Sequence, residues 1–216
     1  MEQNFTRIRM AMPRNNDFPI TRRVLLGLAA SAGAAALMPG RARALTPDSA
    51  SVLVQNVTSE ITRIINSGRS ESAMIGDFER MMARYADMPT IAQSVLGPTA
   101  RSASGGQLSA FTDAFRGYMA RKYGRRFREF IGGTVTVAGA QDTGRYIEVN
   151  STVTMPGQGP FEVRFRVWDR SGQALFIDIL IEGVSLVISE RSEIGAILDR
   201  NGGSIDGTIQ TLRGMG

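Results

Sequence analysis

The segment FEVRFRVWDRSGQALFIDILI, residues 161–181, contains the two runs that decide the fold class. In residues 161–167 apolar and charged side chains alternate, which predicts a strand with one apolar and one charged face. Residues 175–181 are almost entirely apolar, a pattern typical of a strand covered on both faces and central in its sheet. The turn-rich link Arg170-Ser171-Gly172 is short, so the two strands are expected to be antiparallel neighbours.

Working outward, two further strands are predicted at residues 134–138 and 145–155, and turn-rich stretches separate them from each other and from residue 160. Apolar residues at steps of three and four predict helices on both sides of these strands. The expected helices are residues 48–67, 70–85, 89–96, 107–130, 185–200 and 205–215. This order of elements, four helices, then a meander of four strands, then two helices, predicts an α+β domain. Its helices are expected to pack on one face of an antiparallel sheet.

Residues 1–44 have the pattern of a cleavable export signal. A basic region precedes an uncharged stretch at 24–38, and Ala42-Arg43-Ala44 forms a small-x-small cleavage site. That stretch of 15 residues is shorter than the about 20 that a membrane helix needs. The pair Arg22-Arg23 favours twin-arginine export, with an ordinary secretory signal as the alternative. We therefore expect residues 45–216 to work as a single domain outside a bacterial cytoplasm.

Removing this leader changes the charge of the protein. The full chain has 25 basic and 20 acidic residues, of which the leader holds seven and two, so 18 of each remain. A neutral domain gives little support to nucleic-acid binding. Cysteine and histidine are absent, which excludes disulfides, thiol nucleophiles and imidazole bases or ligands. We predict no metal site and no cofactor.

Two features could belong to an enzyme, and both have a simpler structural interpretation. Residues 183–187, GVSLV, begin like a nucleophile elbow but lack its final glycine, and no histidine exists to activate Ser185. We expect Ser185 to cap the following helix. Asp178 and Glu182, four residues apart on a strand, could form an acid/base pair. The apolar neighbours of Asp178 favour a structural hydrogen bond instead, so the main prediction is that the protein is not an enzyme.

The long helix predicted at 107–130 has an aromatic stripe on one side and a basic face on the other. The basic face is either solvated or a contact surface for anionic lipid or an acidic partner. Seven methionines remain in residues 45–216, and several share helix faces with aromatic residues. Flexible methionine side chains suit an adaptable apolar cavity, although ordinary core packing gives the same pattern.

Several segments together resemble a known family. The first is FERMMARY at 78–85, followed by Val95-Leu96-Gly97, and the second is the spacing Phe111-x3-Phe115-x2-Tyr118-x4-Tyr123. The most specific segment is DILIEGVSLV at 178–187, which is followed by Ser189-x-Arg191-Ser192-Glu193 and by residues 202–212. Over nearly all of residues 45–216 the chain resembles the MlaC, or toluene-tolerance, family of periplasmic phospholipid-binding proteins.

The resemblance implies a curved sheet of about four strands with an NTF2-like pocket between sheet and helices. It implies a periplasmic carrier that holds phospholipid acyl chains in this pocket, leaves the head group outside, and ferries lipid between outer and inner membranes. The expected partners are an inner-membrane ABC-transporter complex and an outer-membrane lipoprotein complex. Such a carrier needs no catalytic residue. Each methylene of an acyl chain that is buried in the pocket contributes about 0.8 kcal/mol to the free energy of binding, so the chains alone can hold the lipid.

We expect the pocket lining to come from one strand face and one helix stripe. The predicted lipid-binding residues are Val163, Phe165, Val167, Ile177, Ile179 and Ile181, with Phe111, Phe115, Met119 and Phe127. The predicted partner or head-group surface is Arg121, Lys122, Arg125, Arg126 and Arg128. The residues that match the family motif and are expected to fix the strand-to-helix junction are Asp178, Glu182, Gly183, Ser185 and Arg191.

The chain departs from the family pattern in two places. Leu175-Phe176 stand where the family often has a tryptophan, and the sequence ends at Gly216 without the polar tail of some members. Both departures leave the ligand open, and a related branch associated with hopanoid genes makes a polycyclic lipid a competing cargo. Outside the carrier class, an NTF2-like hydrolase or isomerase would use Asp178 or Glu182, and a lipid-free adaptor would dock through the basic helix.

Overall fold

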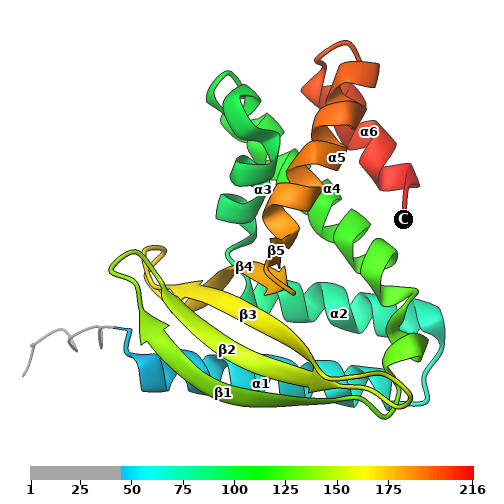
Figure 1. Ribbon diagram of the computed structural model, residues 1–216. Helices are drawn as coiled ribbons and strands as arrows, with labels where there is room; N and C mark the ends of the chain where they lie inside the picture. Colours follow the sequence, from blue (N-terminus) through cyan, green and yellow to red (C-terminus); the bar gives the residue numbers. More distant parts are fainter. Residues whose placement is uncertain (1–44) are drawn as a thin grey trace, which may run out of the picture. The chain divides into compact units, whose positions relative to one another are not determined.

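The computed structural model describes residues 45–216, in which five strands form one antiparallel sheet in the order β1-β2-β3-β4-β5 (Figure 1). The strands are β1 (Thr134–Asp142), β2 (Ile147–Thr154), β3 (Phe161–Trp168), β4 (Leu175–Ile181) and β5 (Val184–Ser185). The predicted four-strand meander is confirmed, and β5 adds only a two-residue edge. The predicted leader, residues 1–44, lies outside the described residues.

Most helices begin at a side chain that caps their first turn. The helices are α1 (Pro47–Ile65), α2 (Glu71–Tyr85), α3 (Met88–Leu96), η1 (Gly97–Arg101), α4 (Gly105–Gly124), η2 (Phe127–Phe130), α5 (Leu186–Arg200) and α6 (Ile205–Gly214). Thr46 and Ser104 cap α1 and α4 through capping boxes. Ser185 caps α5, as predicted, by accepting from the Ile188 amide at 3.2 Å.

The helix predicted at 107–130 is not continuous, because α4 ends at Gly124 and the short 3-10 helix η2 follows. Glycine is a weak helix former, and a β-carbon at Gly124 would lie 2.8 Å from Cγ1 of Ile75 in α2. After the break, the ring of Phe127 packs edge-on against Phe78, with centroids 4.7 Å apart. The aromatic stripe read from the sequence therefore divides between two helices.

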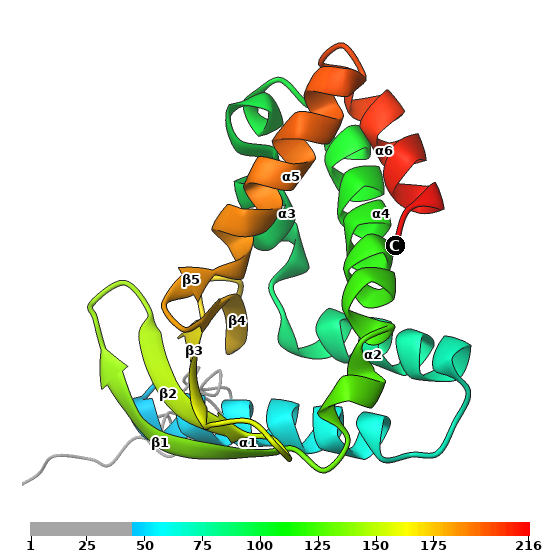
Figure 2. The same cartoon turned by 45° about the vertical axis from the view of Figure 1, so that its right-hand side comes forward.

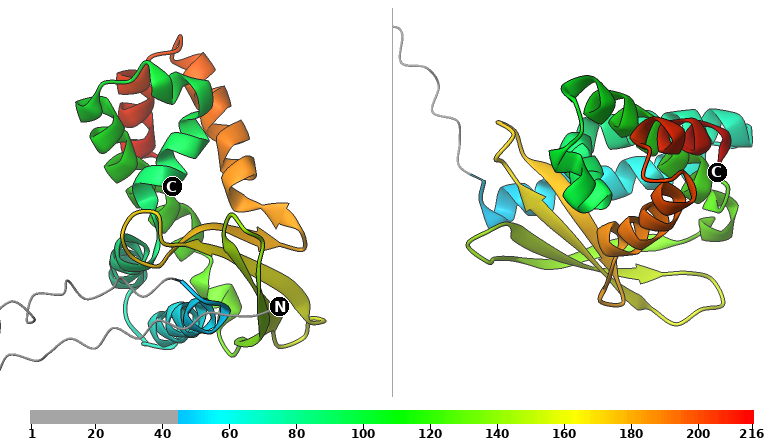
Figure 3. Two further views of the ribbon diagram at one scale, coloured as in Figure 1. Left: turned by 90° about the vertical axis from the view of Figure 1, so that its left-hand side faces the viewer. Right: turned by 90° about the horizontal axis from the view of Figure 1, so that it is seen from above.

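The helices cover one face of the curved sheet, as predicted (Figure 3). Helix α1 packs on β1 and β2, and α4 packs against α2, α3 and α6. Figure 2 shows α4 and α5 rising from the level of the sheet, with α6 beside α4. Within residues 45–216, no helix combines the length and the apolar character needed to cross a membrane.

Strand β4 is not central, which corrects one prediction. Among the strands of the described residues, its neighbours are β3 and the two-residue β5, so it lies close to the sheet edge. Helices α3 and α5 pack against β4, which accounts for its apolar composition. Apolar composition indicates that a strand's side chains are covered, and it does not determine the position of the strand among its neighbours in the sheet.

A β-bulge also changes which side chains of β4 share a face. Arg166 pairs with Asp178, whereas Val167 pairs with Phe176, so Ile177 is the extra residue between two paired positions. The two-residue alternation assumed for Ile177, Ile179 and Ile181 is therefore broken at its first member. Phe176 takes the place predicted for Ile177.

Candidate functional site: an apolar cavity between helices and sheet

A cavity of about 310 Å³ lies between the covered face of the sheet and the surrounding helices. The helical lining includes Val57, Ile61 and Ile65 of α1, Phe78, Met81 and Met82 of α2, Met88 and Ile91 of α3, and Phe115 and Met119 of α4. The strands contribute Val135, Val153, Phe161, Val163, Phe165, Phe176, Ile179 and Ile181. The volume is at the lower end of the range of about 300–1,000 Å³ for small-molecule pockets, and the lining is mainly apolar.

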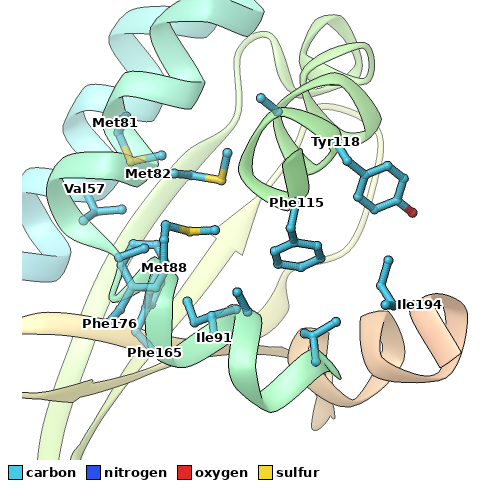
Figure 4. Close-up of a cluster of buried hydrophobic side chains, with 14 of the residues drawn as sticks. Val57, Met81, Met82, Met88, Ile91, Phe115, Tyr118, Phe165, Phe176 and Ile194 are labelled. Atoms are coloured by element: carbon cyan, nitrogen blue, oxygen red, sulfur yellow. The ribbon is translucent and has the colours of Figure 1, made fainter. Parts of the chain in front are cut away.

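Methionines form much of the wall contributed by α2 and α3. In Figure 4 the side chains of Met82, Met88 and Phe115 come from three helices and point toward a common interior. Unbranched methionine side chains can change rotamer at low cost, so this wall can adapt to ligands of different shape.

Seven of the ten predicted lipid-binding residues line this cavity. They are Phe115, Met119, Phe127, Val163, Phe165, Ile179 and Ile181. Phe111 and Val167 are instead fully buried in the core, and Phe111 stacks on Phe115 at 5.9 Å. Ile177 is the bulged residue of β4. Contact of the seven residues with lipid stays a prediction.

Sequence reasoning missed the contribution of α1. Val57, Ile61 and Ile65 lie on the apolar stripe that predicts this helix, yet helical periodicity does not distinguish a cavity wall from a filled core. The cluster Met81-Met82 was the available signal in α2, because methionine-rich faces are common at adaptable cavities.

Some residues of the lining are also exposed to solvent. Ile181 lines the cavity and is also 38% exposed, and the nearby Val184 and Ile188 are 60% and 66% exposed. Arg126, which is exposed, also belongs to the lining. The exposed part of the lining thus includes both an apolar and a basic side chain.

The five predicted surface cations do not form one free patch. Arg121 donates from Nε to the Met215 carbonyl and from Nη2 to the Leu212 carbonyl, both at 2.7 Å, and so holds the end of α6. Lys122 binds carboxylates of α5. These two residues are therefore bonded within the chain, and contact of the five cations with a partner or head group stays a prediction.

The three remaining cations, Arg125, Arg126 and Arg128, are exposed around the end of α4 and the start of η2. Arg126 pairs with Glu129 at 3.0 Å, three residues further along the chain. A surface pair of this kind contributes little to stability. Arg126 is therefore an exposed member of the cavity lining that is tied only by a surface ion pair.

A polar seam joins α4 to α5 beside the cavity. Lys122 Nζ donates to Oε1 of Glu190 at 2.7 Å and to Oε2 of Glu193 at 2.5 Å. The Tyr118 hydroxyl donates to Glu193 and the Tyr123 hydroxyl donates to Glu190, each at 2.6 Å. Short charge-assisted bonds of this kind fix the spacing of the two helices.

The seam also shifts the pKa values of its members. Burial and the hydrogen bond to Glu193 raise the pKa of Tyr118, and burial and the bond to Glu190 raise the pKa of Tyr123. Burial acts to lower the pKa of Lys122, but the hydrogen bonds to the two carboxylates outweigh it and raise that pKa. Hydrogen bonds from Lys122 and Tyr118 lower the pKa of Glu193.

These shifts predict how the stability contributed by Glu193 depends on pH. A carboxylate with a lowered folded-state pKa stabilises the fold above its unfolded pKa, near 4.3, and this contribution disappears as pH falls through the folded-state pKa. We expect Glu193→Gln to lower Tm at pH 7 and the difference from wild type to shrink progressively as the pH falls below about 4. Thermal denaturation followed by circular dichroism from pH 3 to 8 measures this; a constant difference over that range would contradict it.

Asp178 is the most completely bonded carboxylate of the lining. Its Oδ2 accepts from Ser185 Oγ at 2.6 Å and from Arg166 at 3.3 Å, and its Oδ1 accepts from the amides of Ile179 at 2.9 Å and Val187 at 3.2 Å. These bonds join β4, β3 and the start of α5. The predicted structural role of Asp178 is therefore confirmed.

Glu182 does not complete an acid/base pair with Asp178. It lies in the turn after β4 with φ of 49°, a left-handed conformation, and its carboxylate accepts from the Glu162 amide. The predicted same-side strand geometry of the two carboxylates is therefore wrong. Within residues 45–216, no group of three or more histidine, cysteine, aspartate or glutamate side chains could hold a metal ion.

Comparisons with known proteins agree with this arrangement. The family profile described as MlaC protein matches residues 55–214. The toluene tolerance protein ttg2D of Pseudomonas putida is 21% identical over 169 residues, covering 75% of this chain and 79% of that protein. A phospholipid-binding protein of Ralstonia solanacearum, solved in complex with a phospholipid, superposes with a TM-score of 0.65 at 20% identity, covering 76% of this chain and 94% of that one. The structural likeness establishes a shared fold.

Proposed function

The chain belongs to the MlaC protein family, and from that premise we propose that it is a lipid carrier whose cavity holds the acyl chains of a phospholipid. The phospholipid-bound relative with the same fold supports this proposal. The observation that carries it is the apolar cavity of about 310 Å³ between the sheet and the helices, one lining residue of which, Ile181, is also exposed.

The chemistry of the cavity suits acyl chains better than a reacting substrate. Burial of each methylene contributes about 0.8 kcal/mol, so chain burial can hold a lipid without specific bonds. The carboxylate of Asp178 is occupied by four donors, which favours a binding role over catalysis. The family membership points the same way.

The proposal includes a location and partners. Residues 1–44 would be removed on export, and residues 45–216 would act as a single lipid-binding domain in the periplasm. There the protein would shuttle lipid between the outer and inner membranes. Its partners would be an inner-membrane ABC-transporter complex and an outer-membrane lipoprotein complex. The likeness to a toluene tolerance protein supports this assignment.

The test is to purify the protein from the periplasm of a Gram-negative host and analyse its organic extract by mass spectrometry. We expect about one phospholipid per protein, exchangeable with labelled vesicles. A hopanoid in place of phospholipid would assign a different cargo to the same cavity. A protein that carries no lipid and exchanges none would overturn the proposal.

A further inference from the structure

The large apolar side chains that reach solvent are concentrated in two segments. Among residues 45–216 they are Val52, Ile131, Ile181, Val184 and Ile188. Three of them lie within residues 181–188, where β4 turns through β5 into α5 (Figure 1), and Ile131 directly follows η2. Only Val52, on α1, lies elsewhere. Single exposed apolar residues are ordinary on a protein surface, whereas a group of them marks a contact site.

The three residues of segment 181–188 lie close to one another. Ile181 and Val184 are paired across the short hairpin of β4 and β5. Ile188 follows in the first turn of α5. The one charged residue of the segment, Glu182, accepts a hydrogen bond from the Glu162 amide. The segment therefore presents three branched aliphatic side chains to solvent.

Both segments also belong to the wall of the lipid cavity. Ile181 and Val187 line the cavity from one segment, and Phe130 and Gly133, on either side of Ile131, line it from the other. Exposed apolar residues and lining residues thus occur in the same two stretches of chain. A hydrocarbon surface in contact with the exposed residues would meet the segments that enclose the cavity.

The segment that ends at Ile131 also carries an excess of positive charge. Arg125, Arg126 and Arg128 are exposed, and Glu129 is the one acidic residue of segment 125–131. Arg126 pairs with Glu129, and in the described part of the chain Arg125 and Arg128 form no ion pair. Cations beside exposed aliphatic side chains are the combination by which peripheral proteins bind anionic membranes.

This composition favours a membrane over a protein partner. A stable protein interface buries about 800 Å² per partner, around a core enriched in aromatic residues. In the two segments the exposed apolar residues are four aliphatic side chains, and none of the large apolar residues exposed in the range 45–216 is aromatic. Aliphatic side chains enter a bilayer without a complementary shape on the other side, and arginine is suited to lipid phosphates.

We propose that segments 125–131 and 181–188 dock the protein on the surface of an anionic phospholipid bilayer. The four exposed aliphatic side chains enter the boundary between head groups and acyl chains, and the arginines contact lipid phosphates. The proposal rests on the lipid-carrier function and adds the surface by which the cavity wall meets a membrane. The protein should therefore bind a bilayer in the absence of any protein partner.

The test is sedimentation of the protein with vesicles and no other protein. The protein is purified from the periplasm, and its intact mass confirms that residues 1–44 are absent, because the seven basic residues of that segment would bind anionic vesicles by themselves. Vesicles of phosphatidylcholine are compared with vesicles of equal parts phosphatidylcholine and phosphatidylglycerol. We expect about thirtyfold tighter binding to the mixed vesicles, about fivefold for each of two cations, and a loss of this difference at about 1 M salt.

Two double variants separate the apolar contribution from the electrostatic one. Val184→Ser/Ile188→Ser should weaken binding to the mixed vesicles at least about fifteenfold, because it withdraws two or more methylene-sized groups and each contributes about fourfold. Arg125→Gln/Arg128→Gln should weaken the same binding about thirtyfold and leave binding to phosphatidylcholine unchanged. None of these four residues belongs to the cavity lining, so the cavity keeps its side chains.

Matched controls make the same exchanges elsewhere on the surface. Val52→Ser removes a similarly exposed aliphatic side chain from α1. Arg145→Gln/Arg170→Gln removes two exposed cations from the turns between β1 and β2 and between β3 and β4. Both controls should bind the two kinds of vesicle as wild type does.

The outcomes separate this proposal from the lipid-carrier function. Wild type that binds neither kind of vesicle overturns the membrane assignment and leaves an acidic protein as the candidate for the basic segment. Equal binding to both kinds of vesicle overturns the role of the arginines. Variants that bind no worse than their controls overturn the assignment of the two segments. The lipid found in the purified protein tests the carrier function independently, and the wild-type comparison holds even where a variant fails to fold.

Discussion

Replacing Ile61 with tryptophan is expected to weaken phospholipid binding about two hundredfold while leaving the protein folded. Ile61 lies on α1, is only partly buried, and lines the cavity, so a larger side chain can extend into the space without displacing the packed core. Displacing about four methylenes of an acyl chain costs about 3 kcal/mol at 0.8 kcal/mol each, which corresponds to roughly two hundredfold in Kd. Titration of delipidated protein with a fluorescent phospholipid measures the change.

The control for this variant is Val52→Trp. Val52 lies on the same helix, is 53% exposed, and is not part of the cavity lining, so the same aromatic residue is added outside the cavity. Lipid binding by this variant should match wild type. If Ile61→Trp binds lipid as tightly as Val52→Trp, the cavity beside α1 does not hold the acyl chains.

The sheet was predictable because its signals are local. Alternation along residues 161–167 and short turn-rich links define antiparallel neighbours without reference to the rest of the chain. The bulge at Ile177 was not predictable, since nothing in the run LFIDILI marks one residue as extra. As a result, the predicted lining contained Ile177 where the structure places Phe176.

The sequence also did not predict where α4 ends, because packing against another helix competes there with the apolar pattern. The aromatic spacing continues through Gly124 to Phe130, yet the helix ends at Gly124, where α2 approaches closely. Residue spacing describes one helix at a time and contains no information about its neighbours.

Only part of the candidate site could be predicted from the sequence, for a similar reason. Lys122 and Glu190 are 68 residues apart, and a charged residue on a predicted helix is by default assigned to solvent. In the structure α4 lies beside α5, so part of the basic face becomes the polar seam next to the cavity. The apolar half of the site, by contrast, followed from strand alternation at Val163 and Phe165.

Asp178→Ala is expected to destabilise the fold by about 3–5 kcal/mol, the loss typical of breaking a buried, hydrogen-bonded charge pair. The substitution removes the acceptor of the Val187 amide and of the Ser185 hydroxyl, and it leaves Arg166 without one of its two carboxylate partners. These groups hold the start of α5 against β4, so the damage should be concentrated there. For a domain of this size the loss corresponds to a decrease in Tm of about 10 °C or more.

Asp178→Asn separates the hydrogen bonds from the charge. The asparagine oxygen can still accept from the amides of Ile179 and Val187, and its amide nitrogen can donate to the Ser185 hydroxyl, which accepts as well as donates. We expect a smaller loss, about 1–2 kcal/mol, and unchanged lipid transfer between vesicles. Urea denaturation gives the stabilities, and amide exchange at Val187 reports the junction. An alanine variant as stable as wild type would contradict the role of Asp178 in holding β4 to α5. An asparagine variant that folds but transfers no lipid would show that Asp178 acts in function.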